Sequence, residues 1–166
     1  MKSFPTLQTL RCRLERIGST DISILQQIFN DGLTRVYLNE LNDLVSSKDG
    51  IRIFIDSFDR YAGNGEGFLW GIFLNVKLVG FIALMDITYS PSLFYAMHPE
   101  HRSQGIMKEC VTQVLNYISE INICSYVKSE VYKQNTVSIR LLESIGFEKT
   151  GFDEQKIFFS RSLYVQ

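Results

Sequence analysis

The stretch HPEHRSQGIMKEC, His98–Cys110, runs from a proline-bounded turn with a glycine directly into a helical pattern. Apolar or small residues then recur at spacings of three and four, at Ile106, Cys110, Val111, Val114, Leu115 and Ile118. This pattern predicts an amphipathic helix that begins near Gly105. The first N–H groups of a helix have no partner within it and lie at the positive end of its dipole, so the turn is suited to bind a phosphate. Gly105 lets an anion approach the backbone, and Arg102 can add a charge-assisted contact.

A second helical pattern lies further along the chain, in NTVSIRLLESIGFEKTG, Asn135–Gly151. It follows a β-rich run, Tyr126–Tyr132, and the helical period is carried by Ile139, Leu142 and Ile145. Gly146 is a suitable C-terminal stop, and Phe147 opens an extended segment. The chain is therefore predicted to form a strand, a helix and a further strand here.

Together, in this order, the two segments resemble the GNAT superfamily of N-acetyltransferases. Arg102–Met107 resembles the acetyl-CoA signature Q/R-x-x-G-x-G/A, except that Met107 stands where the signature has Gly or Ala. The second segment resembles the N-x-x-S…LE-x-LGF segment of the ribosomal-protein acetyltransferase (RimJ/RimL-like) branch, through Asn135, Ser138, Leu142, Glu143, Ile145, Gly146 and Phe147.

The resemblance implies an acetyl-CoA-dependent N-acetyltransferase. The enzyme would move the acetyl group to a primary amine, either a protein N-terminal α-amine or a small-molecule amine, by direct transfer in a ternary complex. The alternative is a catalytically silent acyl-CoA-binding or regulatory module on the same fold, motivated by Met107 and by Ser92, which stands where the branch often has a carboxylate. Acetyl-CoA and an amine acceptor are the expected partners of a monomer or homodimer. No metal is expected, since His98 and His101 straddle Pro99 and no third ligand is evident.

The resemblance also assigns roles to residues. The coenzyme would be held by Met97, Arg102, Ser103, Gln104, Gly105, Ile106, Met107 and Asn135. The catalytic residues would be Ser138, Tyr95 and Asn135, with Ser138 as proton or hydrogen-bond donor to the thiolate, because Leu142 replaces the tyrosine that many members use as the acid. A backbone N–H near Ala96 or Met97 would bind the oxyanion. Asn135 and Ser138 also fit an ordinary helix cap and first-turn pair, and both interpretations can hold at once.

Three candidates remain for the general base: Asp86, Tyr95 or an ordered water. The strand before the turn often begins E-I-G-Y in the related branch, whereas this chain reads Ser92-Leu93-Phe94-Tyr95. The acceptor affects this question, because at pH 7 an α-amine with a pKa of about 7.8 is roughly 14% neutral and a lysine only about 0.04%. An α-amine could therefore react with little help from a base.

The composition of the chain limits the number of domains and the kinds of partner that we expect. With 166 residues, 45% of them hydrophobic, the chain can bury one core, which predicts a single domain, 1–166. A formal net charge of −1 argues against nucleic acid or an anionic membrane as partner. The three scattered cysteines show no zinc spacing and are expected to be reduced. Without a secretory leader or a long uninterrupted apolar run, we expect a cytoplasmic protein.

The remaining patterns predict an α/β (mixed α+β) protein with the element order β-α-α-β-β-β-α-β-α-β-β. The order matches the GNAT fold, a mixed, twisted central sheet with helices on both sides. In the N-terminal half we expect a strand at Leu7–Ile17, a helix capped by Ser19 or Thr20, and helical pieces at Leu33–Val45 and Ile51–Tyr61 separated by Gly50. The later strands are expected at Phe68–Leu74, Lys77–Asp86 (a hairpin through Asn75-Val76), Ser92–Met97, Tyr126–Val131, Glu148–Phe152 and Ile157–Val165.

Overall fold

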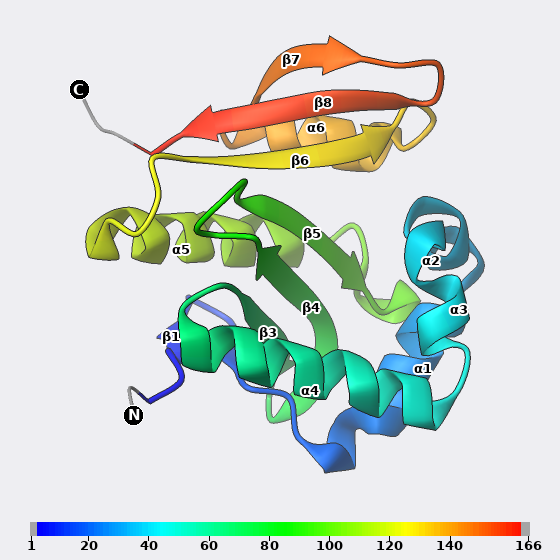
Figure 1. Ribbon diagram of the computed structural model, residues 1–166. Helices are drawn as coiled ribbons and strands as arrows, with labels where there is room; N and C mark the ends of the chain where they lie inside the picture. The colour runs from blue at the N-terminus through cyan, green and yellow to red at the C-terminus, as the bar shows by residue number, and fades with distance from the viewer. Residues whose placement is uncertain (1–2, 164–166) are drawn as a thin grey trace.

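One sheet of eight strands, in the order β1-β2-β3-β4-β5-β6-β8-β7, runs through the computed structural model, which describes residues 3–163 (Figure 1). Neighbouring strands are antiparallel except β5 and β6, which are parallel, so the sheet is mixed as predicted. The strands are β1 (Leu7–Gln8), β2 (Arg13–Glu15), β3 (Phe68–Leu74), β4 (Lys77–Met85), β5 (Ser92–Met97), β6 (Tyr126–Tyr132), β7 (Glu148–Phe152) and β8 (Lys156–Ser162). The end of the last predicted strand, at Val165, lies outside the described residues.

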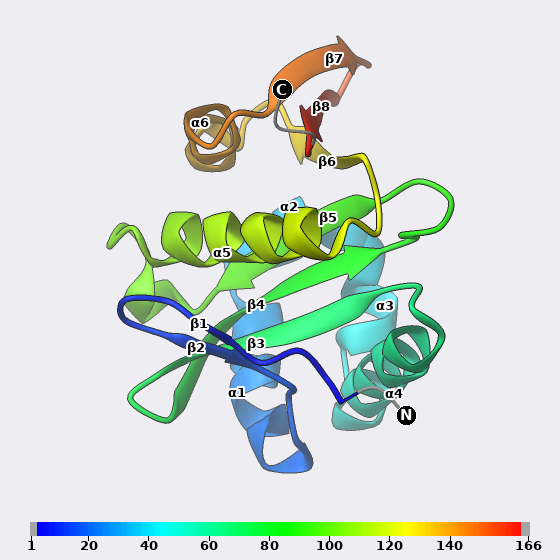
Figure 2. The same ribbon diagram turned by 90° about the vertical axis from the view of Figure 1, so that its left-hand side faces the viewer.

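Helices cover both faces of the sheet (Figures 1 and 2). They are α1 (Ile22–Asn30), α2 (Gly32–Tyr37), α3 (Asn42–Val45), α4 (Lys48–Asn64), α5 (Ile106–Ile121) and α6 (Thr136–Ser144). Alternation along the strands divides the core, because Trp70 and Ile82 pack on the side of α5 and α6, whereas Leu69 and Phe81 pack on the side of α1 and α4. The GNAT-type architecture predicted from the sequence is confirmed. Within residues 3–163 no helix combines the length and the apolar character needed to cross a membrane.

The predicted strand Leu7–Ile17 is wrong, since this segment forms a two-strand hairpin. Thr9 causes the reversal: its N–H donates to Cys12 O at 2.9 Å, and its hydroxyl accepts from Cys12 N–H at 2.9 Å. In a single strand Leu10 would share a face with the buried Cys12 and Leu14, but it is 94% exposed at the tip of the hairpin. The hydrogen bond between the Thr9 hydroxyl and the backbone favours a turn here over a continuous strand.

The helical region before β3 also differs from its prediction. Ser19 and Thr20 do not cap α1; they lie in a short 3₁₀ helix, Ser19–Asp21, that precedes it. Gly50 does not separate two helices but lies in the first turn of α4, where Ser47 caps the helix by accepting from Gly50 N–H. A Cβ on Gly50 would come within 1.6 Å of Leu44 O, so glycine is needed here for close packing of two backbones.

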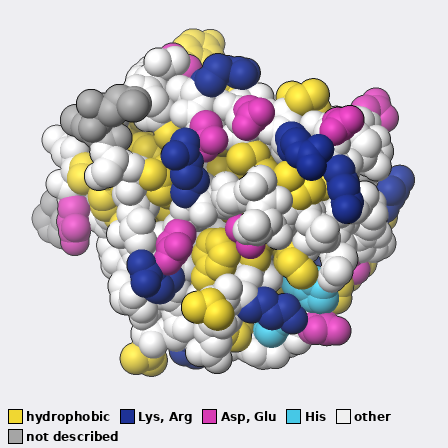
Figure 3. Space-filling view, turned by 90° about the horizontal axis from the view of Figure 1, so that it is seen from below, with side chains coloured by type: hydrophobic (Ala, Val, Ile, Leu, Met, Phe, Trp, Pro, Cys, Tyr) yellow, Lys and Arg dark blue, Asp and Glu magenta, His cyan; other side chains and the backbone are white. Residues whose placement is uncertain are grey.

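The hairpin between β3 and β4 turns at Asn75 and Val76, as predicted, with φ angles of 48° and 63°. Positive φ at both central residues is typical of the two-residue hairpin turn whose twist matches that of the flanking strands. The three cysteines are free thiols, and Cys12 and Cys110 are buried. On the face in Figure 3, basic and acidic side chains are interspersed with apolar ones, so charge of a single sign does not gather on that face.

The sheet separates between β5 and β6. These parallel strands pair at one position, Ser92 with Lys128, and then diverge (Figure 1). Two further bonds support the junction, from Lys128 N–H to Pro91 O at 2.9 Å and from Ser129 Oγ to Leu93 O at 2.9 Å. Beyond it, the edges of β5 and β6 face a cleft.

Candidate active site

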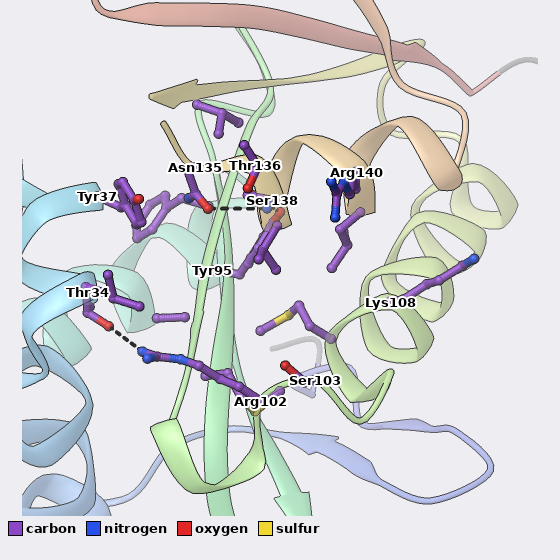
Figure 4. A pocket seen from close by; sticks show the side chains of 18 of the residues that line it. Thr34, Tyr37, Tyr95, Arg102, Ser103, Lys108, Asn135, Thr136, Ser138 and Arg140 are labelled. Atoms are coloured by element: carbon purple, nitrogen blue, oxygen red, sulfur yellow. Dashed lines mark hydrogen bonds between the residues drawn. The ribbon is translucent and has the colours of Figure 1, made fainter. Parts of the chain in front are cut away.

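The cleft between β5 and β6 has a volume of about 730 Å³ and lies between α2, the start of α5, and α6 (Figure 4). Its walls contain all eight residues that the sequence assigned to coenzyme binding. They also contain the assigned catalytic residues Ser138 and Tyr95. The lining includes Met97, Arg102, Ser103, Gln104, Gly105, Ile106, Met107, Asn135, Tyr95 and Ser138.

The turn before α5 leaves backbone donors open to this cleft. Ser103 and Gly105 have φ angles of 62° and 75°, and Gly105 occupies the N-cap without a side-chain cap. The first backbone N–H of α5 that makes a helical hydrogen bond is that of Glu109, which donates to Gly105 O at 3.1 Å. The preceding N–H groups, of Ile106, Met107 and Lys108, make no hydrogen bond to the described residues, and all three residues line the cleft. Such an end of a helix binds anions.

Ile106 and Met107 would present their backbone, and not their side chains, to an anion in the cleft. Both side chains are buried in the core beneath α5, with Met107 8% exposed. The methionine that departs from the family signature therefore packs beneath the helix, the arrangement that would leave the phosphate site open.

Arg102 is half-buried, with 29% of its side chain exposed. The guanidinium pairs with Asp31, and its Nη2 also lies 3.3 Å from Thr34 Oγ1 (Figure 4). Asp31 caps α2 by accepting from Thr34 N–H at 3.2 Å. Burial alone would raise the pKa of Asp31, but the hydrogen bonds from Arg102 and Thr34 outweigh it and hold the pKa below its ordinary value. Arg102 thus joins the turn before α5 to the wall formed by α2.

Arg102→Ala is expected to destabilise the fold by about 1 to 3 kcal/mol, because it leaves the half-buried carboxylate of Asp31 without its charged donor. Urea unfolding, with Arg35→Ala as the control, measures this effect. Arg35 lies on α2, the helix that Arg102 contacts, and its side chain is exposed. Equal stability of the two variants would contradict the structural role of the Arg102–Asp31 pair.

Two hydroxyl groups that are distant in sequence meet inside the cleft. Tyr95, on β5, and Ser138, in the first turn of α6, hydrogen-bond to each other through Oη and Oγ. The Asn135 side chain caps the helix by accepting from Ser138 N–H at 3.3 Å (Figure 4). The structure therefore brings the three predicted catalytic residues together, and the cap interpretation of Asn135 is confirmed. Its Nδ2 makes no hydrogen bond to the described residues.

The phenol of Tyr95 remains protonated at neutral pH. Burial raises its pKa to about 12, although the hydrogen bond with Ser138 lowers it in part. A protonated phenol can donate to Ser138 Oγ and leave the serine proton available to another acceptor. Tyr95 is thereby suited to donate a hydrogen bond, and unsuited to be the general base.

The alternation of β5 decides which backbone N–H faces the cleft. β5 pairs with β4 without a register shift, and the next N–H, of His98, donates to Val79 O on β4 at 2.7 Å. The N–H of Met97 therefore points to the opposite edge, toward β6, and that of Ala96 points to β4. Since β6 has diverged at this point, Met97 N–H opens onto the cleft. Of the two sequence candidates for the oxyanion donor, Met97 has the required direction.

Asp86 does not line the cleft; it is exposed in the loop between β4 and β5. Glu130 on β6 is the only Asp or Glu among the described residues that line it. Its carboxylate lies 3.8 Å from Lys156 Nζ, which also bonds Glu40. Glu130 lies on the face of β6 opposite to the buried Ser129 and Val131. Because these two residues line the cleft as well, alternation along the strand does not single out Glu130.

Sequence reasoning also missed Arg11, at the tip of the N-terminal hairpin. Its Nη1 donates to Gln104 O at 2.9 Å, and its Nε pairs with Glu109 Oε1 at 2.9 Å. The contact joins residues more than ninety positions apart in the sequence, so no local pattern indicates it.

Comparison with known proteins agrees with this geometry. Residues 11–148 match the family described as acetyltransferase (GNAT) domain. The chain therefore belongs to the GNAT family of acetyltransferases. A curated relative, the uncharacterized N-acetyltransferase YoaA of Bacillus subtilis, is 29% identical over 167 residues, which cover 97% of this chain and 93% of the relative.

Solved structures show the same fold. RimL, a ribosomal-protein α-N-acetyltransferase in complex with coenzyme A, has a TM-score of 0.81 at 12% identity, with 95% of this chain and 98% of that one covered. RimJ from Mycobacterium smegmatis, in complex with a CoA disulfide, has a TM-score of 0.80 at 15% identity, with 95% and 87% covered. The chain therefore shares the fold of these two acetyltransferases.

Proposed function

We propose that the protein transfers the acetyl group of acetyl-CoA directly to a primary amine within a ternary complex. The observation that carries this proposal is the hydrogen-bonded pair of Tyr95 and Ser138 in the same cleft as the open N-terminus of α5. One end of the cleft supplies backbone N–H groups that can donate hydrogen bonds to an anion. The other end supplies a hydroxyl whose proton is free to form a further hydrogen bond. RimL and RimJ, which share the fold, are described as complexes with coenzyme A and its disulfide.

Each group has a part in the proposed transfer. The N–H groups of Ile106–Lys108 hold the pyrophosphate of the coenzyme, and Asn135 lies beside the path of its pantetheine arm. Met97 N–H donates to the carbonyl oxygen as the amine attacks and negative charge develops. When the tetrahedral intermediate collapses, the C–S bond breaks and the Ser138 hydroxyl donates a hydrogen bond that stabilises the leaving thiolate. Tyr95 holds Ser138 in position by its own hydrogen bond.

The acceptor loses its proton without a strong protein base in this proposal. Tyr95 stays protonated, and Glu130 is the one carboxylate among the described lining residues. Glu130, directly or through water, would attract the amine and receive its proton. An α-amine, which is already partly neutral at pH 7, suits such a site better than a lysine side chain.

The walls on the acceptor side favour a compact monoamine over a polycation. Leu33 and Tyr37 of α2, Leu38 just after it, Phe94 and Tyr132 give this side an apolar and aromatic surface. Polyamines and aminoglycosides carry several cations, and a single carboxylate cannot pair with them all. We therefore propose an α-amine of a peptide or a small monoamine as the acceptor.

The experiment combines coenzyme-dependent melting with release of free CoA. Acetyl-CoA at about one hundred times its dissociation constant should add about 2.7 kcal/mol to the free energy of unfolding. CoA release should then depend on amine in a panel of peptides with Ser, Ala or Thr at the N-terminus, small monoamines, polyamines and aminoglycosides. Stabilisation without turnover of any amine would favour the silent acyl-CoA-binding module. Melting that ignores acetyl-CoA would contradict coenzyme binding itself.

A further inference from the structure

The tip of the β1–β2 hairpin supports the turn before α5 from the side away from the catalytic hydroxyls. Figure 4 shows the hairpin running below Arg102 and Ser103, whereas Tyr95 and Ser138 lie above them. Arg11 makes the contact, with Nη1 bonded to Gln104 O at 2.9 Å. Its Nη2 would lie 3.5 Å from a Cβ on Gly105, so the guanidinium rests against that glycine.

This contact fixes the direction of a backbone donor. The peptide bond between Gln104 and Gly105 is trans, so its C=O and N–H point in opposite directions. Arg11 draws the carbonyl toward the hairpin, which turns the Gly105 N–H away from the hairpin and toward the cleft that Gly105 lines. Because Gly105 has no Cβ and a positive φ, this peptide could otherwise rotate with little steric restraint.

Arg11 also neutralises a charge that is unfavourable to an anion. Glu109 lies in the first turn of α5, and its carboxylate accepts from Arg11 Nε at 2.9 Å, from Arg11 N–H at 3.0 Å and from Thr9 Oγ1 at 2.6 Å. Burial would raise the pKa of Glu109, but the hydrogen bonds from Thr9 and Arg11 outweigh it and hold the pKa below its ordinary value. An ionised carboxylate near the start of a helix would repel a second anion there.

We propose that Arg11 is a positioning residue for the coenzyme phosphates: it directs Gly105 N–H into the cleft and cancels the charge of Glu109. This inference rests on the proposed function, because it takes the turn before α5 as the phosphate site. It assigns a role in coenzyme binding to the N-terminal hairpin, which does not line the cleft.

The test compares two thioesters, acetyl-CoA and acetyl-pantetheine, of which only the first carries the pyrophosphate and the 3′-phosphate. Arg11→Gln should raise the dissociation constant of acetyl-CoA roughly ten-fold, the equivalent of one charge-assisted hydrogen bond. The value of kcat/KM with acetyl-pantetheine should not change. Arg13→Gln is the matched control, since Arg13 lies on the same hairpin and pairs with Glu15 at 60% side-chain exposure.

A second variant separates positioning from mere support of the fold. Glu109→Gln removes the negative charge and should tighten acetyl-CoA binding by roughly two- to five-fold, the opposite direction from Arg11→Gln. A purely structural network predicts that both variants melt lower and that neither distinguishes the two thioesters. That result would overturn the proposal, as would unchanged affinity in Arg11→Gln. Should Arg11→Gln fail to fold, Arg11→Lys, which keeps the charge but not the planar fork, takes its place and should show a smaller loss in the same direction.

Failure of this inference can be told from failure of the proposed function. If the unmodified protein binds no acetyl-CoA, the proposed function fails. If it binds acetyl-CoA and Arg11→Gln binds it equally well, only the role of Arg11 fails.

Discussion

Ser138→Ala is expected to lower kcat and kcat/KM together by roughly ten- to ten-thousand-fold, while the dissociation constant of acetyl-CoA changes little. The range extends from one lost hydrogen bond to full general-acid assistance. Ser138 is buried and bonded to Tyr95, so the alanine variant leaves the phenol without its partner but disturbs no phosphate contact. Steady-state kinetics with the true acceptor, together with coenzyme titration, measure the two quantities.

Tyr95→Phe is the companion variant for Ser138. It removes the hydroxyl that positions Ser138 Oγ and keeps the ring, so we expect a smaller loss of kcat than in Ser138→Ala. A pure helix-cap role for the Asn135–Ser138 pair predicts another result, about 1 kcal/mol of destabilisation with near-normal turnover. Unchanged turnover in Ser138→Ala would refute the catalytic assignment, and Tyr95 or Tyr132 would become the acid to test.

Met107→Ala is expected to destabilise the protein by roughly 2 to 5 kcal/mol, because truncation of a buried methionine leaves a cavity. The side chain is 8% exposed and belongs to the core beneath α5. Met107→Leu, which nearly conserves volume, is the control and should cost less than about 1.5 kcal/mol. Denaturant unfolding measures stability, and coenzyme titration measures affinity. An alanine variant of native stability that binds acetyl-CoA more tightly would show that the thioether crowds the phosphates.

The second half of the fold could be predicted from sequence because its patterns are local. The periodicity after Gly105 and Asn135, and the glycine stop at Gly146, determine α5 and α6 through contacts within a few residues. The first half was harder. The hydroxyl of Thr9 ends a strand that the alternation of apolar and polar residues would continue. Gly50 reads in the sequence as a break between helices, whereas in the structure it allows α4 to pack closely against the backbone of Leu44.

The site divides in the same way. Asn135 and Ser138 share one helical turn, so their motif predicts their proximity, and Tyr95 joins them once β5 and α6 are placed on the two walls of the cleft. Arg102 was assigned to the coenzyme by its place in the signature, but a partner on another helix, Asp31, decides where its side chain lies. Arg11 and Glu130 owe their positions to hairpin and strand geometry that appears only in three dimensions.

The single pairing of β5 with β6 also determines which contacts hold the two parts of the sheet together. Strand hydrogen bonds do not hold β6, β7, β8 and α6 to the rest of the sheet over most of their length; apolar contacts under α5 do. Polar bonds between side chains also cross the cleft, from Tyr95 to Ser138 and from Lys156 to Glu40. Because strand pairing between the two parts is confined to the junction at Ser92, a ligand that contacts both walls of the cleft would add to the bonds that hold these parts together.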